Sequence, residues 1–119
     1  MASDPSRSGL TLHALDTATG KPAACLGYTL FRISGEAREA LASGHTNEDG
    51  RCAAPMLTDG ALCVGVYEVV FDVAAWRGDA AEVGFYDLVP IRFRVAHANG
   101  HYHIPLLISP FGYTTYRGS

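Results

Sequence analysis

The sequence predicts an all-β domain, a sandwich or barrel of short strands. Turn signals recur along the chain and leave apolar, β-branched runs between them; they are TATGKP, NEDG, TDG, ANG and SPFG. The clearest run is VYEVVFDV (66–73), in which alternate residues from Tyr67 to Val73 are apolar and share one face. Period-two alternation of this kind is typical of a half-buried strand, and several such strands at fairly even spacing indicate a sandwich or barrel.

The remaining elements follow the same pattern with two exceptions. Strands are expected at 10–15, 26–33, 66–73, 90–95, 101–108 and 112–118. In the first of these, Thr11, His13 and Leu15 share one face, opposite an apolar face. The segment SGEAREALASG (34–44) has a helix-like composition that leaves its assignment open, and VAAWRGD (73–79) suits one short helix.

Length and composition bound the class of protein. The chain has 119 residues, of which 48% are hydrophobic and 18% charged, which favours one packed domain over 10–119 after a loose polar lead at 1–9. A formal charge of −3 with no basic cluster argues against nucleic acid as a partner. Because no run is long and apolar enough for a bilayer or a secretory signal, we expect no membrane association and a cytoplasmic location.

Three cysteines, Cys25, Cys52 and Cys63, match neither a zinc motif nor a redox motif. Their odd number disfavours a disulfide framework. We therefore expect reduced, mostly buried small apolar residues.

Histidines and one arginine are the candidates for chemistry. His101 and His103 would project to the same face of a strand, with β-carbons about 7 Å apart, so a zinc site is the first hypothesis to test, although no third ligand shows a suitable spacing. His13 lies in an apolar strand, where a structural histidine satisfied by a backbone carbonyl is the main alternative. Arg51 follows the NEDG turn at the expected start of a strand and could equally be a solvated residue. Nucleophile and phosphate-loop motifs are lacking.

Four stretches of the chain carry a family resemblance: LTLHALDTATGKPA (10–23), TNEDGRC (46–52), HYHIPLLISPFGYTTYRGS (101–119) and, more loosely, YEVVFDVAAW (67–76). Together they resemble the transthyretin family, and within it the 5-hydroxyisourate hydrolases of urate breakdown. The resemblance covers nearly the whole chain. A terminal Tyr-Arg-Gly-Ser is similar to the signature that separates the hydrolases from the hormone carrier.

The resemblance implies a sandwich of two four-stranded sheets with one short helix. It also implies a pocket formed by His13, Arg51 and His103, with substrate-binding residues at the C-terminus; these are Tyr116, Arg117, Gly118 and Ser119. His101 matches no functional position of the motif and is expected at the rim or on the surface, and His45 and His97 are expected in loops. With a permanent cation at Arg51, we expect neither a metal nor a cofactor.

The activity that the resemblance implies is the hydrolytic opening of a ring amide in 5-hydroxyisourate to give 2-oxo-4-hydroxy-4-carboxy-5-ureidoimidazoline. The implied assembly is a homotetramer, a dimer of dimers with its sites at the interface between dimers. The alternative is a carrier of the same architecture that holds an apolar small molecule in a central channel. Two histidines and an arginine facing that channel would disfavour an apolar ligand, because their desolvation is costly.

Overall fold

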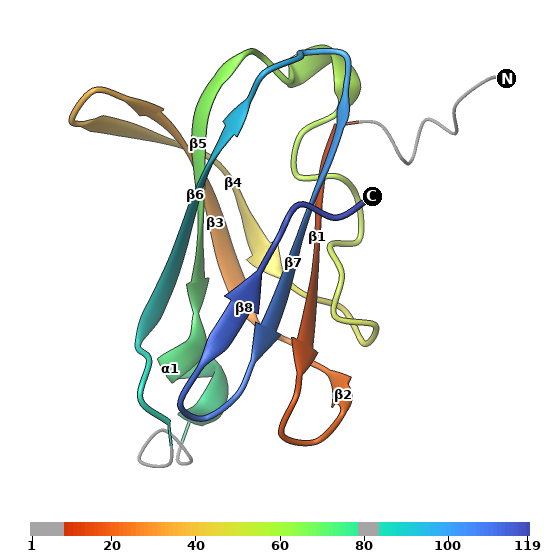
Figure 1. Ribbon diagram of the computed structural model, residues 1–119, viewed down its shortest axis with the longest axis vertical. Coiled ribbons are helices and arrows are strands. Elements are labelled where there is room, and N and C mark those ends of the chain that lie inside the picture. Colours follow the sequence, from red (N-terminus) through yellow and green to blue (C-terminus); the bar gives the residue numbers. More distant parts are fainter. Residues whose placement is uncertain (1–8, 79–83) are drawn as a thin grey trace, which may run out of the picture.

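Two four-stranded sheets form the two layers of a sandwich in the computed structural model, which describes residues 9–78 and 84–119 (Figure 1). The first sheet has the strand order β2-β1-β7-β8 and the second β4-β3-β5-β6. The elements are β1 (Gly9–Asp16), β2 (Lys21–Pro22), β3 (Gly27–Ser34), β4 (Ala37–His45), the 3₁₀ turn η2 (Asp59–Ala61), β5 (Gly65–Asp72), α1 (Val73–Arg77), β6 (Leu88–Val95), β7 (His101–Ile108) and β8 (Tyr113–Thr115). The predicted fold class, two four-stranded sheets and one short helix, is confirmed.

Strand β1 is the centre of the first sheet. It pairs with β7 in parallel over its whole length and with β2 in antiparallel orientation at its end. Its side chains alternate as expected, with Leu10, Leu12 and Ala14 fully buried or nearly so. Thr11 and His13 lie on the opposite face and are only partly buried. The first sheet therefore has one face in the core and one outer face that carries polar side chains.

The core fills the space between the two sheets. Leu12 and Ile104 contribute from the first sheet, and Leu30, Tyr67 and Phe71 from the second. Full burial of such a large apolar side chain stabilises the folded state by roughly 1.5–3 kcal/mol. This packing fixes the inner face of β1 and β7, and through the alternation of the strands it also fixes which side chains point outward.

The segment at 34–44, whose assignment the composition left open, is mostly strand. Residues of β4 pair with β3 in antiparallel register, with an irregularity between Leu30 and Phe31. Seven of its nine residues are exposed, because β4 is an edge strand with one neighbour. An exposed edge strand lacks the apolar alternation that identifies a strand in a sequence. His45, expected in a loop, is the last residue of β4.

The short helix predicted at 73–79 is α1, which ends at Arg77; residue 79 lies outside the described residues. Asp72 caps the helix, since its Oδ1 accepts a hydrogen bond of 3.2 Å from the amide of Ala75. The indole of Trp76 donates a hydrogen bond of 2.9 Å to the carbonyl of Ala24. No helix among residues 9–78 and 84–119 is long and apolar enough to cross a membrane.

The three cysteines are free thiols but do not occupy the core, so the prediction that they are mostly buried is wrong. Cys25 and Cys63 are exposed and Cys52 is intermediate. Cys25 lies in the turn before β3 with a positive φ of 62°, a conformation that residues other than glycine rarely adopt. Composition cannot reveal the exposure of these thiols, because it ignores where along the chain the turns fall.

The C-terminal strand is shorter than expected. The prediction was a strand over 112–118, whereas β8 ends at Thr115. The chain then continues beside β7, where Gly118 forms an isolated bridge with His103. The last residues consequently continue the edge of the first sheet alongside β7. Of the N-terminal lead predicted at 1–9, residues 1–8 lie outside the described residues, and Gly9 opens β1.

Candidate active site

The outer face of β1 and β7 brings two of the predicted histidines together. In the parallel register Thr11 pairs with His103 and His13 pairs with Pro105. His13 and His103 are therefore diagonal neighbours on adjacent strands, and both side chains are partly buried. The face opposite them is the sandwich core, so the imidazoles point outward from the first sheet.

Arg51 reaches the same face from a turn at the edge of β1. The side chain of Asn47 accepts hydrogen bonds from the amides of Asp49 and Arg51, at 2.9 and 3.1 Å, and holds the turn closed. Gly50 then accepts a hydrogen bond of 2.7 Å from the amide of Ala14. Arg51 lies beside His13 in an isolated antiparallel bridge. The strand expected to start at Arg51 is thus a single bridge along the edge of β1.

Partial burial and the arginine keep both imidazoles in the neutral form. Burial lowers the pKa of His13, and the Arg51 guanidinium lowers it further. A hydrogen bond from the imidazole to the backbone of Asp49 and the Asp49 carboxylate oppose this shift without reversing it. Burial also lowers the pKa of His103, followed by the charge of Arg51, then by His101 and by His13. Since an unperturbed histidine has a pKa of about 6.5, both rings are mostly unprotonated at neutral pH and can accept a proton.

The C-terminal segment closes one side of this group. The amide of Gly118 donates a hydrogen bond of 2.8 Å to the carbonyl of His103. Arg117 packs over the ring of Tyr102 at 4.3 Å and donates a hydrogen bond of 3.2 Å to the carbonyl of His101. Its guanidinium therefore anchors the segment against a core-facing tyrosine. Ser119 is exposed at the end of the chain.

Tyr116 is 59% exposed and lies with Arg117 at the opening between the two sheets. The two side chains line a recess of about 240 Å³ together with residues of β6 and with Tyr102 and Ile104. Of the seven predicted site residues, the structure therefore gathers His13, Arg51, His103 and Gly118 on one outer face. Tyr116 and Arg117 lie at the adjoining edge.

Two residues beside His103 were not assigned a role from the sequence. Thr11 Oγ1 lies 2.8 Å from His103 Nδ1, a hydrogen bond between residues 92 positions apart. The His101 ring, expected at the rim, stacks on His103 with centroids 6.3 Å apart and planes 10° apart. The shared face of His101 and His103 was visible in the sequence. The hydrogen bond to Thr11 was not, because it depends on the pairing of β1 with β7.

The zinc hypothesis for His101 and His103 gains no third ligand. Within the described ranges, 9–78 and 84–119, no group of three or more His, Cys, Asp or Glu side chains is placed to hold a metal ion. Arg51 lies beside His13, and its charge also acts on His103. A permanent cation at that position opposes the binding of another one.

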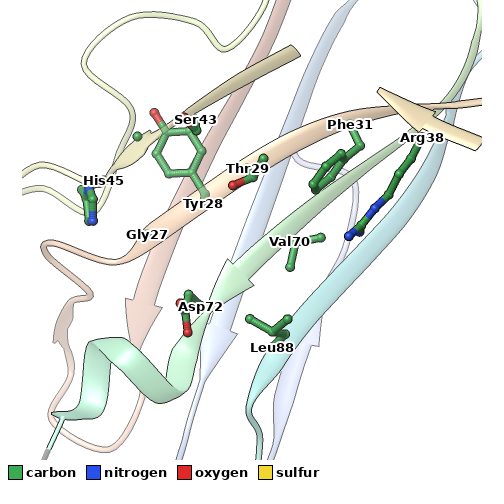
Figure 2. A pocket seen from close by; sticks show the side chains of 11 residues that line it. Gly27, Tyr28, Thr29, Phe31, Arg38, Ser43, His45, Val70, Asp72 and Leu88 are labelled. Carbon is green, nitrogen blue, oxygen red and sulfur yellow. The ribbon is translucent and has the colours of Figure 1, made fainter. Parts of the chain in front are cut away.

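A separate recess of about 540 Å³ lies on the second sheet (Figure 2). Its lining includes Tyr28, Phe31, Arg38, His45 and Asp72, and Arg38 stacks over Phe31 at 4.2 Å. None of the predicted site residues contributes to it. The histidine and arginine group on the first sheet is therefore distinct from this recess.

The candidate site is thus an outer sheet face that carries two histidines beside an arginine, on a two-layer β-sandwich. The HIUase/Transthyretin family model matches residues 10–118, and the chain belongs to this family. Among curated proteins, it is 54% identical to the 5-hydroxyisourate hydrolase of Mesorhizobium japonicum, over 92% of this chain and 91% of the relative. It is 46% identical to 5-hydroxyisourate hydrolase 2 of Rhizobium meliloti, over 96% of this chain and 99% of the relative.

Solved structures agree with this assignment. The chain is similar to the 5-hydroxyisourate hydrolase of Klebsiella pneumoniae, with a TM-score of 0.77, 34% identity and coverage of 92% of this chain and 98% of that one. Sea bream transthyretin in complex with thyroxine gives a TM-score of 0.82 at 29% identity, covering 92% and 93%. An (S)-allantoin synthase gives 0.84 at 35% identity; this chain is covered to 98% but spans only 46% of that protein.

Proposed function

We propose that this protein is a hydrolase that opens a ring amide of 5-hydroxyisourate, giving 2-oxo-4-hydroxy-4-carboxy-5-ureidoimidazoline, in the breakdown of urate. Curated relatives at 46% and 54% identity carry the name 5-hydroxyisourate hydrolase and are matched over nearly their whole length. The observation that carries the proposal is the group of His13, Arg51 and His103 on one outer face, with the pKa of each histidine lowered.

The two histidines supply the base for this reaction. A neutral imidazole takes a proton from water as the water oxygen attacks the amide carbonyl carbon. The ring C–N bond then breaks, and the proton passes to the departing nitrogen. A histidine whose pKa lies below its ordinary value is ready to accept the proton at neutral pH, which is the condition for His13 and His103.

Arg51 supplies a positive charge for the carbonyl oxygen of the substrate. Its guanidinium is planar, permanently charged and able to donate two parallel hydrogen bonds to carbonyl oxygens. Negative charge develops on the carbonyl oxygen during attack, and a fixed cation beside it lowers the barrier. The turn closed by Asn47 fixes the backbone of Arg51 beside His13.

The C-terminal residues bind the heterocycle in this proposal. Tyr116, with its exposed ring, offers a stacking surface, and Ser119 offers a hydroxyl. Gly118 holds the segment against His103 through its amide. Arg117 is engaged with Tyr102 and the His101 carbonyl, so its contribution is chiefly to position its neighbours.

The assembly proposed is a homotetramer, a dimer of dimers with the sites between dimers. Two features support association. The outer face of the first sheet leaves the histidines only half covered by the chain itself. Large apolar side chains are also exposed near the open edges of the sheets, as with Phe85, Leu88, Phe111 and Tyr113. A cytoplasmic location remains a prediction from the sequence.

The carrier alternative rests on likeness to transthyretin in complex with thyroxine. In this chain the outer face of the first sheet holds two imidazoles and, beside them, a guanidinium. Covering those groups with an apolar ligand would remove water from them without replacing its hydrogen bonds, which costs free energy. The polar face therefore favours the hydrolase over the carrier.

The test follows the ultraviolet decay of freshly generated 5-hydroxyisourate. Untagged protein, His103→Ala protein and buffer are compared, each with and without a chelator. We expect the wild-type protein to speed decay with or without chelator, and the variant to lose a factor of about 10² to 10⁴. Loss of activity with chelator would refute a metal-independent reaction. If neither protein outruns buffer, the hydrolase proposal fails, and thyroxine-like aromatic ligands become the next probes for the purified protein.

A further inference from the structure

Thr11 and His103 form a side-chain hydrogen bond across the two central strands of the first sheet. The Oγ1 atom of Thr11 lies 2.8 Å from Nδ1 of His103, and the two residues are direct partners in the parallel register of β1 and β7. Both side chains are partly buried, so water competes less for the bond than at an open surface. The hydrogen bond therefore follows from the register in which β1 and β7 pair.

The opposite edge of the same ring is held by the C-terminal segment. A β-carbon built on Gly118 would lie 2.5 Å from Cδ2 of His103 and 3.2 Å from its Cγ, so the backbone of Gly118 packs directly against this edge. Nε2 is bonded to Cδ2 and lies toward the far end of the ring. With Nδ1 occupied by Thr11, Nε2 is the ring nitrogen left to exchange a proton.

We propose that Thr11 is a positioning residue that accepts a hydrogen bond from Nδ1–H of His103, so that the neutral ring carries its lone pair on Nε2. This inference rests on the proposed function, since it specifies how His103 takes part in the same site. A ring that gains and loses a proton through Nε2 keeps Nδ1–H in both its neutral and charged forms. One acceptor at Nδ1 then serves the ring throughout the reaction.

The surroundings of His103 make the hydroxyl the appropriate acceptor. The charged and titratable groups acting on the ring are Arg51 from the turn beside β1, His101 from β7 and His13 from β1, all of which disfavour its protonation. A carboxylate at Nδ1 would offset this effect and raise the pKa. Among the described residues, Thr11 is the one whose side chain forms a hydrogen bond with the His103 ring. A neutral hydroxyl orients the ring while leaving its pKa low.

The experiment compares Thr11→Val, which keeps the shape but removes the acceptor, with Thr11→Ser, which keeps the hydroxyl. Thr29→Val is the matched control, because Thr29 lies on β3 in the other sheet. The first readout is the ring ¹⁵N spectrum of His103 in the full-length protein above neutral pH. We expect wild type, Thr11→Ser and Thr29→Val to show a protonated Nδ1 and a bare Nε2, and Thr11→Val to move toward a mixture of tautomers.

The second readout is the rate of 5-hydroxyisourate hydrolysis. In metal sites, loss of the hydrogen-bond partner that orients a histidine costs about 10- to 100-fold in activity, and we expect a loss of this order for Thr11→Val, mainly in kcat. Its acidic limb in the profile of kcat/KM against pH should move to lower pH, because the imidazolium has lost an acceptor. Thr11→Ser should restore both properties.

The two readouts separate this inference from the proposed function. An unchanged His103 tautomer in folded Thr11→Val protein would overturn the inference even if the enzyme is active. Equal loss of activity in Thr11→Ser and Thr11→Val would overturn it as well, because it would indicate packing and not the hydroxyl. A tautomer that follows Thr11 in a protein without hydrolase activity would support the positioning role and refute the proposed function.

Discussion

The backbone of Gly118 lies against the imidazole of His103, leaving no room for a β-carbon. The amide of Gly118 donates to the His103 carbonyl at 2.8 Å, and an added β-carbon would lie 2.5 Å from Cδ2 of the ring. The terminal segment and the histidine therefore fit only when residue 118 is glycine. This contact joins the end of the chain to the centre of the first sheet.

Replacing Gly118 by alanine should displace His103 and lower activity while the fold survives. The extra methyl must push either the ring or the terminal segment, and a displacement of about 1 Å in a catalytic group can cost on the order of 10²-fold in rate. Steady-state hydrolysis of 5-hydroxyisourate measures the loss. Gly112→Ala is the control, since its β-carbon would meet only Ser109 Oγ at 3.6 Å, an ordinary contact. Equal activities of the two variants would show that the packing of Gly118 against His103 does not set the position of the ring.

The charge of Arg51 should be visible in the pH profile. Arg51 lowers the pKa of both His13 and His103, because a nearby cation disfavours the charged imidazolium. Arg51→Gln removes the cation, so both pKa values should rise and the acidic limb of kcat/KM should move to higher pH. Arg51→Lys keeps the charge, so its limb should stay close to that of wild type.

Both Arg51 variants should also lose rate, by about 10²- to 10³-fold if the guanidinium stabilises the developing oxyanion. The lysine variant then separates the two effects, because it lacks the planar fork but not the charge. The measurement is kcat/KM from pH 5 to 9. If the acidic limb of kcat/KM lies at the same pH in Arg51→Gln as in wild type, the arginine does not lower the pKa values of the histidines.

Local patterns in the sequence were sufficient to predict which residues share a face of a strand. The alternation around His13 placed this residue on the face opposite Leu10, Leu12 and Ala14, and the spacing of His101 and His103 placed both on one face of β7. These inferences need only the period of a strand, which is fixed by backbone geometry. Motif resemblance then grouped His13, His103 and Arg51, which the structure brings together.

Pairing between distant strands was beyond the sequence. Thr11 meets His103 because β1 and β7 run parallel in one particular register, and a slip of a single residue would send the side chain to the other face. The exposure of the cysteines and the edge strand β4 were not predicted, for a related reason. Burial depends on where a segment lies in the finished sandwich, and neither composition nor period encodes it.

Stability should fall in mild acid because of the two histidines. In the folded protein their pKa values are lowered, whereas in the unfolded chain they return to about 6.5. Below that pH the unfolded chain binds protons that the folded chain resists, so the free energy of unfolding decreases as pH falls. Above that range both states are neutral, and these histidines contribute no pH dependence.

Urea unfolding from pH 8 to pH 5, at one fixed protein concentration, measures this effect. The double variant His13→Gln, His103→Gln should show a shallower decline toward acid than wild type, with pH 8 as the internal reference. The two proteins should differ by a constant amount near pH 8 and converge or cross as pH falls. A parallel decline in both proteins would exclude the histidines as its source.

The turn that presents Arg51 depends on Gly50, and Gly20 provides a matched comparison. Both glycines have a positive φ, 74° and 75°, so alanine at either position pays the cost of the left-handed conformation, about 1–2 kcal/mol. The surroundings differ, because a β-carbon on Gly20 would meet nothing within 4 Å, whereas one on Gly50 would collide with the carbonyl oxygen of Ala14.

Gly50→Ala should therefore lose a further 1–3 kcal/mol, roughly the cost of overpacking, in its free energy of unfolding. Relief of the collision must move the turn away from β1, which carries Arg51 away from His13 and lowers activity. Gly20→Ala should retain full activity, because its turn between β1 and β2 lies apart from the site. Urea unfolding and hydrolysis assays on both variants measure the difference. Equal destabilisation with activity intact in Gly50→Ala would mean that the turn does not set the position of Arg51.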